Sequence, residues 1–163
     1  RARLEAAGAV RRLWVAPGEG HPFGSVARRT AAEAEALRAR AADAGAPPPA
    51  EALAVREELV ARAPEAVLLH GDFRQGKVLA GTRAPWLAVG PVPLVGERAY
   101  DVAGLVLDRC EDLVAEPGGA AEVRRRVARL ADALEVDRER LRGWALFRAV
   151  AAGLRAAAPA DRR

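Results

Sequence analysis

The residues best suited to chemistry stand close together in one short segment, His70-Gly71-Asp72-Phe73-Arg74-Gln75-Gly76-Lys77. The aspartate follows the histidine by two residues, and Lys77 follows the aspartate by five. A carboxylate held in a fixed loop can accept the proton of a hydroxyl group, which is general-base chemistry. The apolar runs Val67-Leu68-Leu69 and Val78-Leu79-Ala80 flank the segment. We therefore expect two short strands to hold the loop in place.

A His-x-Asp triplet followed by a polar site is the spacing of the kinase catalytic loop, in which the aspartate accepts the proton of the substrate hydroxyl. The spacing alone is weak evidence, but other motifs agree with it: Leu68-Leu69-His70-Gly71-Asp72, Pro85-Trp86-Leu87-Ala88-Val89, Leu94-Val95-Gly96 and Ala99-Tyr100-Asp101-Val102-Ala103. Together these motifs closely resemble the aminoglycoside and hydroxyurea antibiotic-resistance kinases of the streptomycin phosphotransferase type. The resemblance runs from about residue 10 to about residue 155.

That resemblance implies a two-lobed, protein-kinase-like fold, of which residues 1–163 form the C-terminal lobe as a single domain without the N-terminal ATP lobe. It implies that Asp72 stands at the position of the catalytic base and that His70 shapes the loop. It also implies that Asp101 braces the loop by hydrogen bonds. ATP, magnesium and an antibiotic hydroxyl group would be the ligands, with the γ-phosphate of ATP passing to the alcohol.

Two positions depart from the family pattern. Where the family has an asparagine that binds magnesium, five residues after the aspartate, this chain has Lys77. Where the family has a second magnesium ligand, an aspartate, this chain has Gly90. Charged lysine has no lone pair to offer a cation, and magnesium requires oxygen ligands. We therefore predict no metal site of the family type, and no cofactor is assigned to this chain.

Two interpretations of Lys77 follow. In the first, which we favour, the site is degenerate and the chain is a catalytically impaired or inactive member of its family. In the second, the ammonium of Lys77 replaces part of the metal charge beside the phosphates, which predicts metal-independent nucleotide binding. Enzyme activity is therefore left open. The alternative function is a non-catalytic helical module that binds a small cationic ligand, such as an antibiotic, or a protein.

The elements that must position this loop are mainly helical. Apolar residues recur at helical spacing in six stretches, three before the loop and three after it, within residues 2–14, 25–41, 52–63, 102–113, 123–134 and 141–154. Ser25 is suited to cap the second helix. A third short strand is expected at Trp86-Leu87-Ala88-Val89, and residues 156–163 are expected to fray. The fold class is therefore mainly α, with short strands around the loop.

Composition excludes several classes of protein. The single cysteine, Cys110, excludes a disulfide framework and a cysteine zinc site. No apolar run approaches a membrane span, and the first residues do not resemble a signal peptide, so we expect a cytoplasmic protein. The net charge of +4 arises near the C-terminus, where Arg124-Arg125-Arg126 and Arg129 could contact nucleic acid. We expect instead that they form a solvated helix face.

The other conspicuous residues have structural interpretations. Trp14, Trp86 and Trp144 are expected in the core, Cys110 as a buried thiol, and His21 in a turn. Spacing does not select among the acids that could hold a cationic antibiotic, which are Glu33, Glu35, Glu111, Asp112 and Glu116. A C-terminal lobe without the N-terminal lobe would expose the apolar face that the N-terminal lobe normally covers, which predicts self-association through that face.

Overall fold

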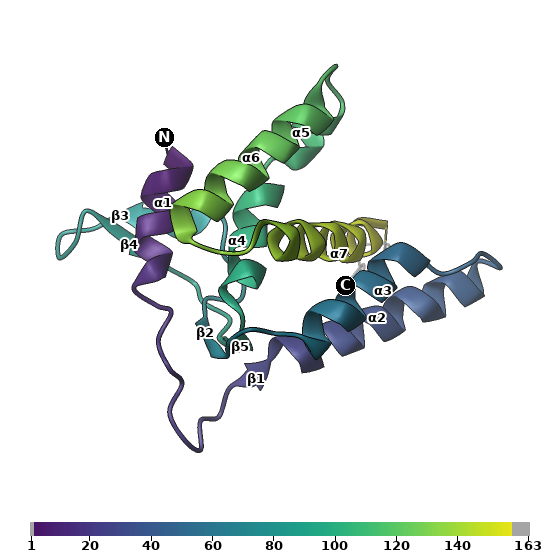
Figure 1. Ribbon diagram of the computed structural model, residues 1–163, viewed down its shortest axis with the longest axis horizontal. Coiled ribbons are helices and arrows are strands. Elements are labelled where there is room, and N and C mark those ends of the chain that lie inside the picture. The colour runs from purple at the N-terminus through teal and green to yellow at the C-terminus, as the bar shows by residue number, and fades with distance from the viewer. Residues whose placement is uncertain (1, 158–163) are drawn as a thin grey trace, which may run out of the picture.

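A computed structural model describes residues 2–157, with side chains described for residues 5–153. This part of the chain is mainly helical, as predicted (Figure 1). The helices are α1 (Ala2–Arg11), α2 (Val26–Asp43), α3 (Ala50–Ala61), α4 (Arg98–Leu107), α5 (Cys110–Val114), α6 (Gly119–Leu134) and α7 (Arg138–Ala157). The strands are β1 (Gly24–Ser25), β2 (Val67–Leu69), β3 (Val78–Ala80), β4 (Trp86–Ala88) and β5 (Leu94–Gly96), and a 3₁₀ turn spans Gln75–Lys77. Of the residues expected to fray, 156 and 157 are helical and 158–163 lie outside the described residues.

Helix α7 is the centre of the packing. It runs between the α2–α3 pair and helices α4 and α6, and it contacts all four (Figure 1). The predicted apolar stripe faces inward, with Leu141, Trp144, Phe147 and Ala151 all buried. The Trp144 ring meets the rings of Tyr100 and Phe147 edge to face, at centroid separations of 5.3 and 6.3 Å. Such contacts between large buried rings add to the stabilisation that burial alone provides.

The buried carboxylate of Glu97 joins the start of α4 to α7. It accepts hydrogen bonds from Trp144 Nε1 at 2.6 Å and from Arg140 Nε at 2.7 Å. The hydrogen bond to Glu97, together with the negative charge of Glu97, stabilises the guanidinium and raises the pKa of Arg140. Since Glu97 is almost fully buried, losing Arg140 would leave an uncompensated charge in the interior.

The stretch expected to form one helix from residue 102 to residue 113 is two helices, so that prediction is wrong. The chain leaves the helical path at Asp108, and Arg109 has a φ of 55°, which ends α4 before α5 begins. Arg126 explains how the break is stabilised. Its buried guanidinium donates to the carbonyl oxygens of Val106 and Asp108, at 2.8 and 2.9 Å. These are carbonyls that a continuing helix would have satisfied internally.

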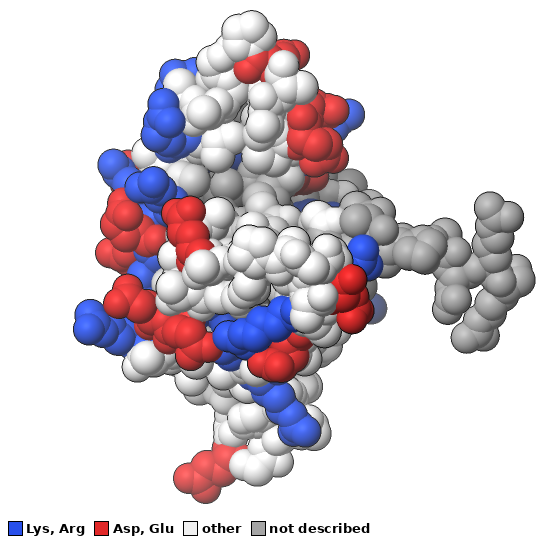
Figure 2. Space-filling model, turned by 90° about the vertical axis from the view of Figure 1, so that its right-hand side faces the viewer, with Lys and Arg blue, Asp and Glu red and all other residues white. Residues whose placement is uncertain are grey.

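Arg126 therefore does not lie on the outer face of its helix, where the arginine cluster was expected, whereas Arg125 and Arg129 do. Both of these ion-pair with Glu122, at 2.9 Å each, and the hydrogen bond from Arg125 lowers the pKa of Glu122. The ion pairs of Arg125 and Arg129 with Glu122 agree with the expected solvated helix face. Figure 2 shows basic and acidic side chains mixed on one side of the molecule.

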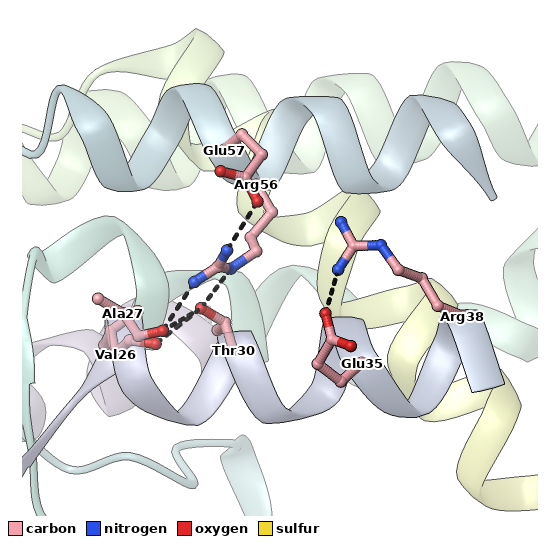
Figure 3. Close-up of polar contacts among 7 residues, drawn as sticks. All are labelled: Val26, Ala27, Thr30, Glu35, Arg38, Arg56 and Glu57. Atoms are coloured by element: carbon pink, nitrogen blue, oxygen red, sulfur yellow. Dashed lines mark hydrogen bonds and ion pairs between the residues drawn. The ribbon is translucent and has the colours of Figure 1, made fainter. Parts of the chain in front are cut away.

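The α2–α3 pair is held by a buried arginine (Figure 3). Helix α2 begins where Ser25 Oγ accepts a hydrogen bond from the amide of Arg28, as predicted. Arg56 of α3 reaches across to Thr30 Oγ1 at 2.9 Å and to the carbonyl oxygen of Ala27 at 2.7 Å. The sequence pattern places Ala63 in the inward stripe of this helix, but α3 ends at Ala61 and Ala63 is exposed.

Two small sheets carry the loop that follows β2. Strand β5 lies between β1, to which it is parallel, and β2, to which it is antiparallel. Strands β3 and β4 form an antiparallel hairpin that extends from the body of the molecule (Figure 1). The apolar runs do not predict β1, which consists only of Gly24 and Ser25, or β5, which comes directly after Pro93. Among the described residues, no helix is both long and apolar enough to cross a bilayer.

Candidate functional site

The segment singled out by its chemistry connects β2 to β3 through the 3₁₀ turn, and it is tied to residues 89–92. Val92 N donates to the His70 carbonyl oxygen, and Val89 N donates to the Lys77 carbonyl oxygen, each at 2.8 Å. Gly71 permits the close approach. Its φ is 83°, and a Cβ at this position would collide with the carbonyl oxygen of Val92. The loop therefore has a fixed path.

Asp101 lies fully buried in the first turn of α4, directly behind the loop. Its Oδ2 accepts from His70 N at 2.8 Å and from Trp14 Nε1 at 3.1 Å. Its Oδ1 accepts from Gly71 N at 2.9 Å. The carboxylate thus accepts from the two backbone amides that directly follow strand β2. Trp14, expected only as core packing, is half-buried and serves as the third donor.

His70 is buried, and both of its ring nitrogens face backbone groups. Nδ1 lies 3.3 Å from the amide nitrogen of Asp72, and Nε2 lies 2.8 Å from the carbonyl oxygen of Val89. An amide can only donate and a carbonyl can only accept. The pattern therefore fits the neutral ring with its proton on Nε2. In that form His70 connects the loop at Asp72 to the chain just before Gly90.

The three remaining predicted positions, Asp72, Lys77 and Gly90, lie together at the surface of this loop. Lys77 Nζ lies 3.3 Å from Asp72 Oδ2, and the two side chains are 24% and 44% exposed. A Cβ at Gly90 would lie only 3.0 Å from the same Nζ. The ammonium thus lies between the Asp72 carboxylate and the space that a side chain at residue 90 would enter.

This donor set does not fit magnesium. Asp72 supplies a carboxylate, but that carboxylate is paired with the Lys77 ammonium, and Gly90 supplies no side-chain oxygen. Across the described part of the chain, no cluster of three or more His, Cys, Asp or Glu side chains could hold a metal ion. A divalent cation bound to Asp72 would also be repelled by the Lys77 ammonium, which lies 3.3 Å from that carboxylate. The residues at this site therefore favour the Asp72–Lys77 ion pair over a bound metal.

Two cavities flank Asp72. One, of about 290 Å³, is lined by Arg29, Glu33, Gly71, Asp72, Tyr100 and Arg148. The other, of about 240 Å³, shares Asp72 and Arg148 and includes Glu111 in its lining. Five acids were candidates to hold a cationic antibiotic, and two of them, Glu33 and Glu111, each line a cavity together with Asp72. Glu35, Asp112 and Glu116 do not line either cavity.

The sequence did not identify Arg29 and Arg148, although both are anchored beside the loop. Arg29 Nη1 donates to the carbonyl oxygen of Gly71 at 2.9 Å. Arg148 Nη1 donates to the carbonyl oxygen of Tyr100 at 2.6 Å, and its guanidinium lies over the Tyr100 ring at 4.5 Å. Arginine is abundant throughout the chain, so neither position stands out from spacing or composition.

Three other expectations concern residues away from this loop. Trp144 is buried as predicted, but Trp86 is 39% exposed on the hairpin, so its assignment to the core is wrong. Helix α1 contacts β4 but leaves much of this indole uncovered. Cys110 is only partly buried, because the end of α4 moves it off the apolar stripe. His21 is partly buried in its turn, where Nδ1 accepts from Phe23 N at 3.3 Å.

Comparison with known proteins supports the resemblance seen in the motifs. The family model described as aminoglycoside/hydroxyurea antibiotic resistance kinase matches residues 1–159. Streptomycin 6-kinase of Streptomyces glaucescens is 42% identical over 77 residues, which is 47% of this chain and 25% of that protein. Hydroxyurea phosphotransferase of Kitasatospora aureofaciens is 38% identical over 91 residues, which is 56% of this chain and 24% of that protein. The chain thus spans about a quarter of the curated relatives that it matches.

Solved structures show the same fold. An aminoglycoside phosphotransferase of Streptomyces rimosus superposes with a TM-score of 0.61 at 22% sequence identity, covering 93% of this chain and 62% of that one. The same enzyme in complex with ADP and streptomycin gives a TM-score of 0.60. The helical arrangement around the loop is therefore kinase-like. With a family model that matches nearly the whole sequence, the chain belongs to the aminoglycoside/hydroxyurea antibiotic resistance kinase family.

Proposed function

We propose that this chain is the C-terminal lobe of a phosphotransferase of that family, which moves the γ-phosphate of ATP to an alcohol group of a small antibiotic. The relatives named for streptomycin and hydroxyurea support this reaction class. In this proposal Asp72 is the base that accepts the hydroxyl proton, and Asp101 and His70 hold its backbone. A cytoplasmic location, where ATP is available, follows from this proposal.

We further propose that the reaction is severely impaired in this chain. The observation that carries this step is the ion pair between Lys77 Nζ and Asp72 Oδ2 at 3.3 Å. The ion pair engages the carboxylate oxygen that would have to accept the hydroxyl proton. The ammonium also occupies the space in which a metal would neutralise phosphate charge. Phosphoryl transfer depends almost wholly on such positioning and neutralisation. The same observation favours the second candidate, a non-catalytic module that keeps the small-molecule cavity.

A phosphotransfer assay tests the proposed function. With ATP, magnesium and either streptomycin or hydroxyurea, the protein carrying this chain is expected to transfer phosphate at least a hundredfold more slowly than its Lys77→Asn/Gly90→Asp variant. The expected factor follows from the about 10²–10³-fold cost of removing one charge-stabilising group from an active site. Asp72→Asn in the repaired variant serves as the control, because it should abolish the gain. Rapid transfer by the parent chain would contradict the proposed impairment.

The exposed hairpin supports a proposal of self-association. Leu79 and Leu87 stand opposite each other on one face, and they are 54% and 40% exposed. Trp86, on the other face, is 39% exposed. A two-stranded ribbon with apolar side chains exposed on both faces is a site for association with another surface. The expected partner is the same apolar hairpin of a second copy of this chain.

Light scattering with a matched pair of variants checks this proposal. The double variant Leu79→Ser/Leu87→Ser is expected to shift the chain from oligomers to monomer. Val114→Ser is the control, since Val114 is 66% exposed but lies on α5, away from the hairpin. A parent chain that stays monomeric at high concentration would refute self-association through the hairpin.

A further inference from the structure

We propose that Asp108 is a positioning residue for the loop: its carboxylate caps the 3₁₀ turn Gln75–Lys77 and thereby directs residue 77 toward Asp72. The inference deepens the proposed function and rests on it, because the same turn presents Lys77 to the proposed base. It is carried by a hydrogen bond between distant segments, from Gln75 N to Asp108 Oδ2 at 2.9 Å.

The 3₁₀ turn is not capped by the residues next to it. Lys77 N donates to the Arg74 carbonyl oxygen at 2.9 Å, but the first amide of a helical turn, that of Gln75, has no partner inside the turn. Arg74, at the N-cap, makes no side-chain capping bond. Gly76 in the middle of the turn adds backbone freedom. The cap that fixes this turn therefore comes from Asp108, 33 residues further along the chain.

Asp108 is the last of three positions at which α4 contacts the loop. Asp101, Gly104 and Asp108 follow one another at intervals of three and four residues, so they lie along one face of the helix. Asp101 accepts from the two backbone amides just before Asp72. Gly104 lies so close to the Phe73 carbonyl oxygen that a Cβ would collide with it. The loop therefore runs along α4, and Asp72 lies between two points that carboxylates hold.

The place of Asp108 is an unfavourable one for a carboxylate. It is the C-cap of α4, where the partial negative charge of the helix end repels an anion. The backbone here also has a φ of 55° at Arg109, and the buried Arg126 donates to the Asp108 carbonyl oxygen at 2.9 Å. These features keep Asp108 at the loop in spite of the repulsion. They indicate that its carboxylate has a specific task there.

Lys77 offers a direct way to observe the cap. It ends the capped turn, and its Nζ lies 3.3 Å from Asp72 Oδ2 with the lysine side chain only 24% exposed. Loss of the cap would free the turn at Gly76 and exchange the ion pair for solvent. Lys77 is the only lysine in the sequence, so its ε-amine can be followed with a chemical reagent.

Acetylation of Lys77 with an N-hydroxysuccinimide ester, followed by mass spectrometry of the peptides, tests the inference without any phosphotransfer. Asp72→Asn sets the rate for an unpaired lysine. We expect Asp108→Ala to react about fivefold faster than the parent chain, the factor that a partly exposed ion pair can supply. Asp108→Asn keeps an oxygen that can cap the turn, so it should stay near the parent rate. Asp132→Ala, which removes an exposed acid from α6, is the matched control and should not change the rate.

The outcomes separate this inference from the proposed function. Equal rates for the parent chain and Asp108→Ala, with Asp72→Asn faster, would overturn the positioning role and leave the Asp72–Lys77 pair intact. An Asp72→Asn variant no faster than the parent would overturn this inference together with the proposed impairment. Faster acetylation of Asp108→Ala, combined with no gain of phosphotransfer in Lys77→Asn/Gly90→Asp, would support this inference while refuting the proposed impairment.

Amide hydrogen exchange followed by nuclear magnetic resonance distinguishes a local effect from unfolding. The Gln75 amide should be protected in the parent chain, and exchange there at the rate of a free peptide would overturn the proposal without any variant. In Asp108→Ala this amide should exchange about tenfold faster, whereas those of His70 and Gly71, held by Asp101, should not change. An equal rise at all three amides would show general destabilisation and refute the positioning role.

Discussion

The double variant Lys77→Asn/Gly90→Asp is expected to bind a divalent cation that the parent chain does not bind. The variant replaces the ammonium beside Asp72 with an amide oxygen and adds a carboxylate at residue 90. A Cβ at Gly90 would lie only 3.0 Å from Lys77 Nζ, which itself lies 3.3 Å from Asp72 Oδ2, so the new carboxylate enters the space beside Asp72 that the ammonium leaves. Carboxylate and amide oxygens are suitable ligands for magnesium and manganese. Titration with Mn²⁺, followed by electron paramagnetic resonance, measures the binding directly.

The two single variants should not behave alike, because the substitutions are physically coupled. Gly90→Asp alone brings a third charged group to the Asp72–Lys77 pair, and the ammonium should bind the new carboxylate in place of a metal. Lys77→Asn alone removes the repelling charge but supplies no second carboxylate, so it should bind Mn²⁺ only weakly. We therefore expect the gain in Mn²⁺ affinity of the double variant, relative to the parent chain, to exceed the product of the gains of the two single variants. Such non-additivity is the signature of interacting residues.

A control is needed for backbone strain at residue 90. Gly90 has a φ of 62°, where a residue with a side chain is disfavoured, although aspartate tolerates this region better than most. Gly18→Asp is the matched variant, since Gly18 has a φ of 79° and nothing within 4 Å of a Cβ. It should cost similar backbone strain and gain no metal. Mn²⁺ binding by the parent chain, or none by the double variant, would show that Lys77 and Gly90 do not control metal binding beside Asp72.

The sequence was most informative where local patterns determine the structure. The loop between two apolar runs, the Ser25 cap and the inward stripe of α7 all follow from spacing within a few residues. The motif around Asp101 marked a residue whose carboxylate does lie behind the loop. In each case the residue types within a short stretch of chain determine the local structure.

The parts that could not be predicted depend on contacts between distant segments. The break after α4 is stabilised by Arg126, which belongs to a later helix, so residues 102–113 alone look continuous. Likewise, Arg29 and Arg148 come from opposite ends of the chain and meet only in the folded molecule. The pairing of Lys77 with Asp72 depends on how the 3₁₀ turn directs the lysine, which residue type does not reveal.

Asp101→Ala is expected to be the most destabilising single substitution at the site. It would leave the amides of His70 and Gly71 and the indole N–H of Trp14 without their acceptor, in a region where Asp101 is 0% exposed. Each buried donor left unsatisfied costs about 1–3 kcal/mol. We therefore expect the free energy of unfolding to fall by about 3–5 kcal/mol, allowing for some rescue by water. Denaturant unfolding followed by circular dichroism measures the change.

Asp101→Asn separates the loss of acceptors from the loss of volume. An amide of the same shape keeps one oxygen but turns its NH₂ group toward a backbone N–H, so two donors would face each other. We expect this variant to lose nearly as much stability as Asp101→Ala, whereas Asp112→Ala, at an exposed acid on α5, should stay within about 0.5 kcal/mol of the parent. If Asp101→Asn were as stable as Asp112→Ala, the paired amides of the loop would not need a carboxylate. The bracing of residues 70 and 71 would then have to come from the carbonyl and amide contacts to Val89 and Val92 alone.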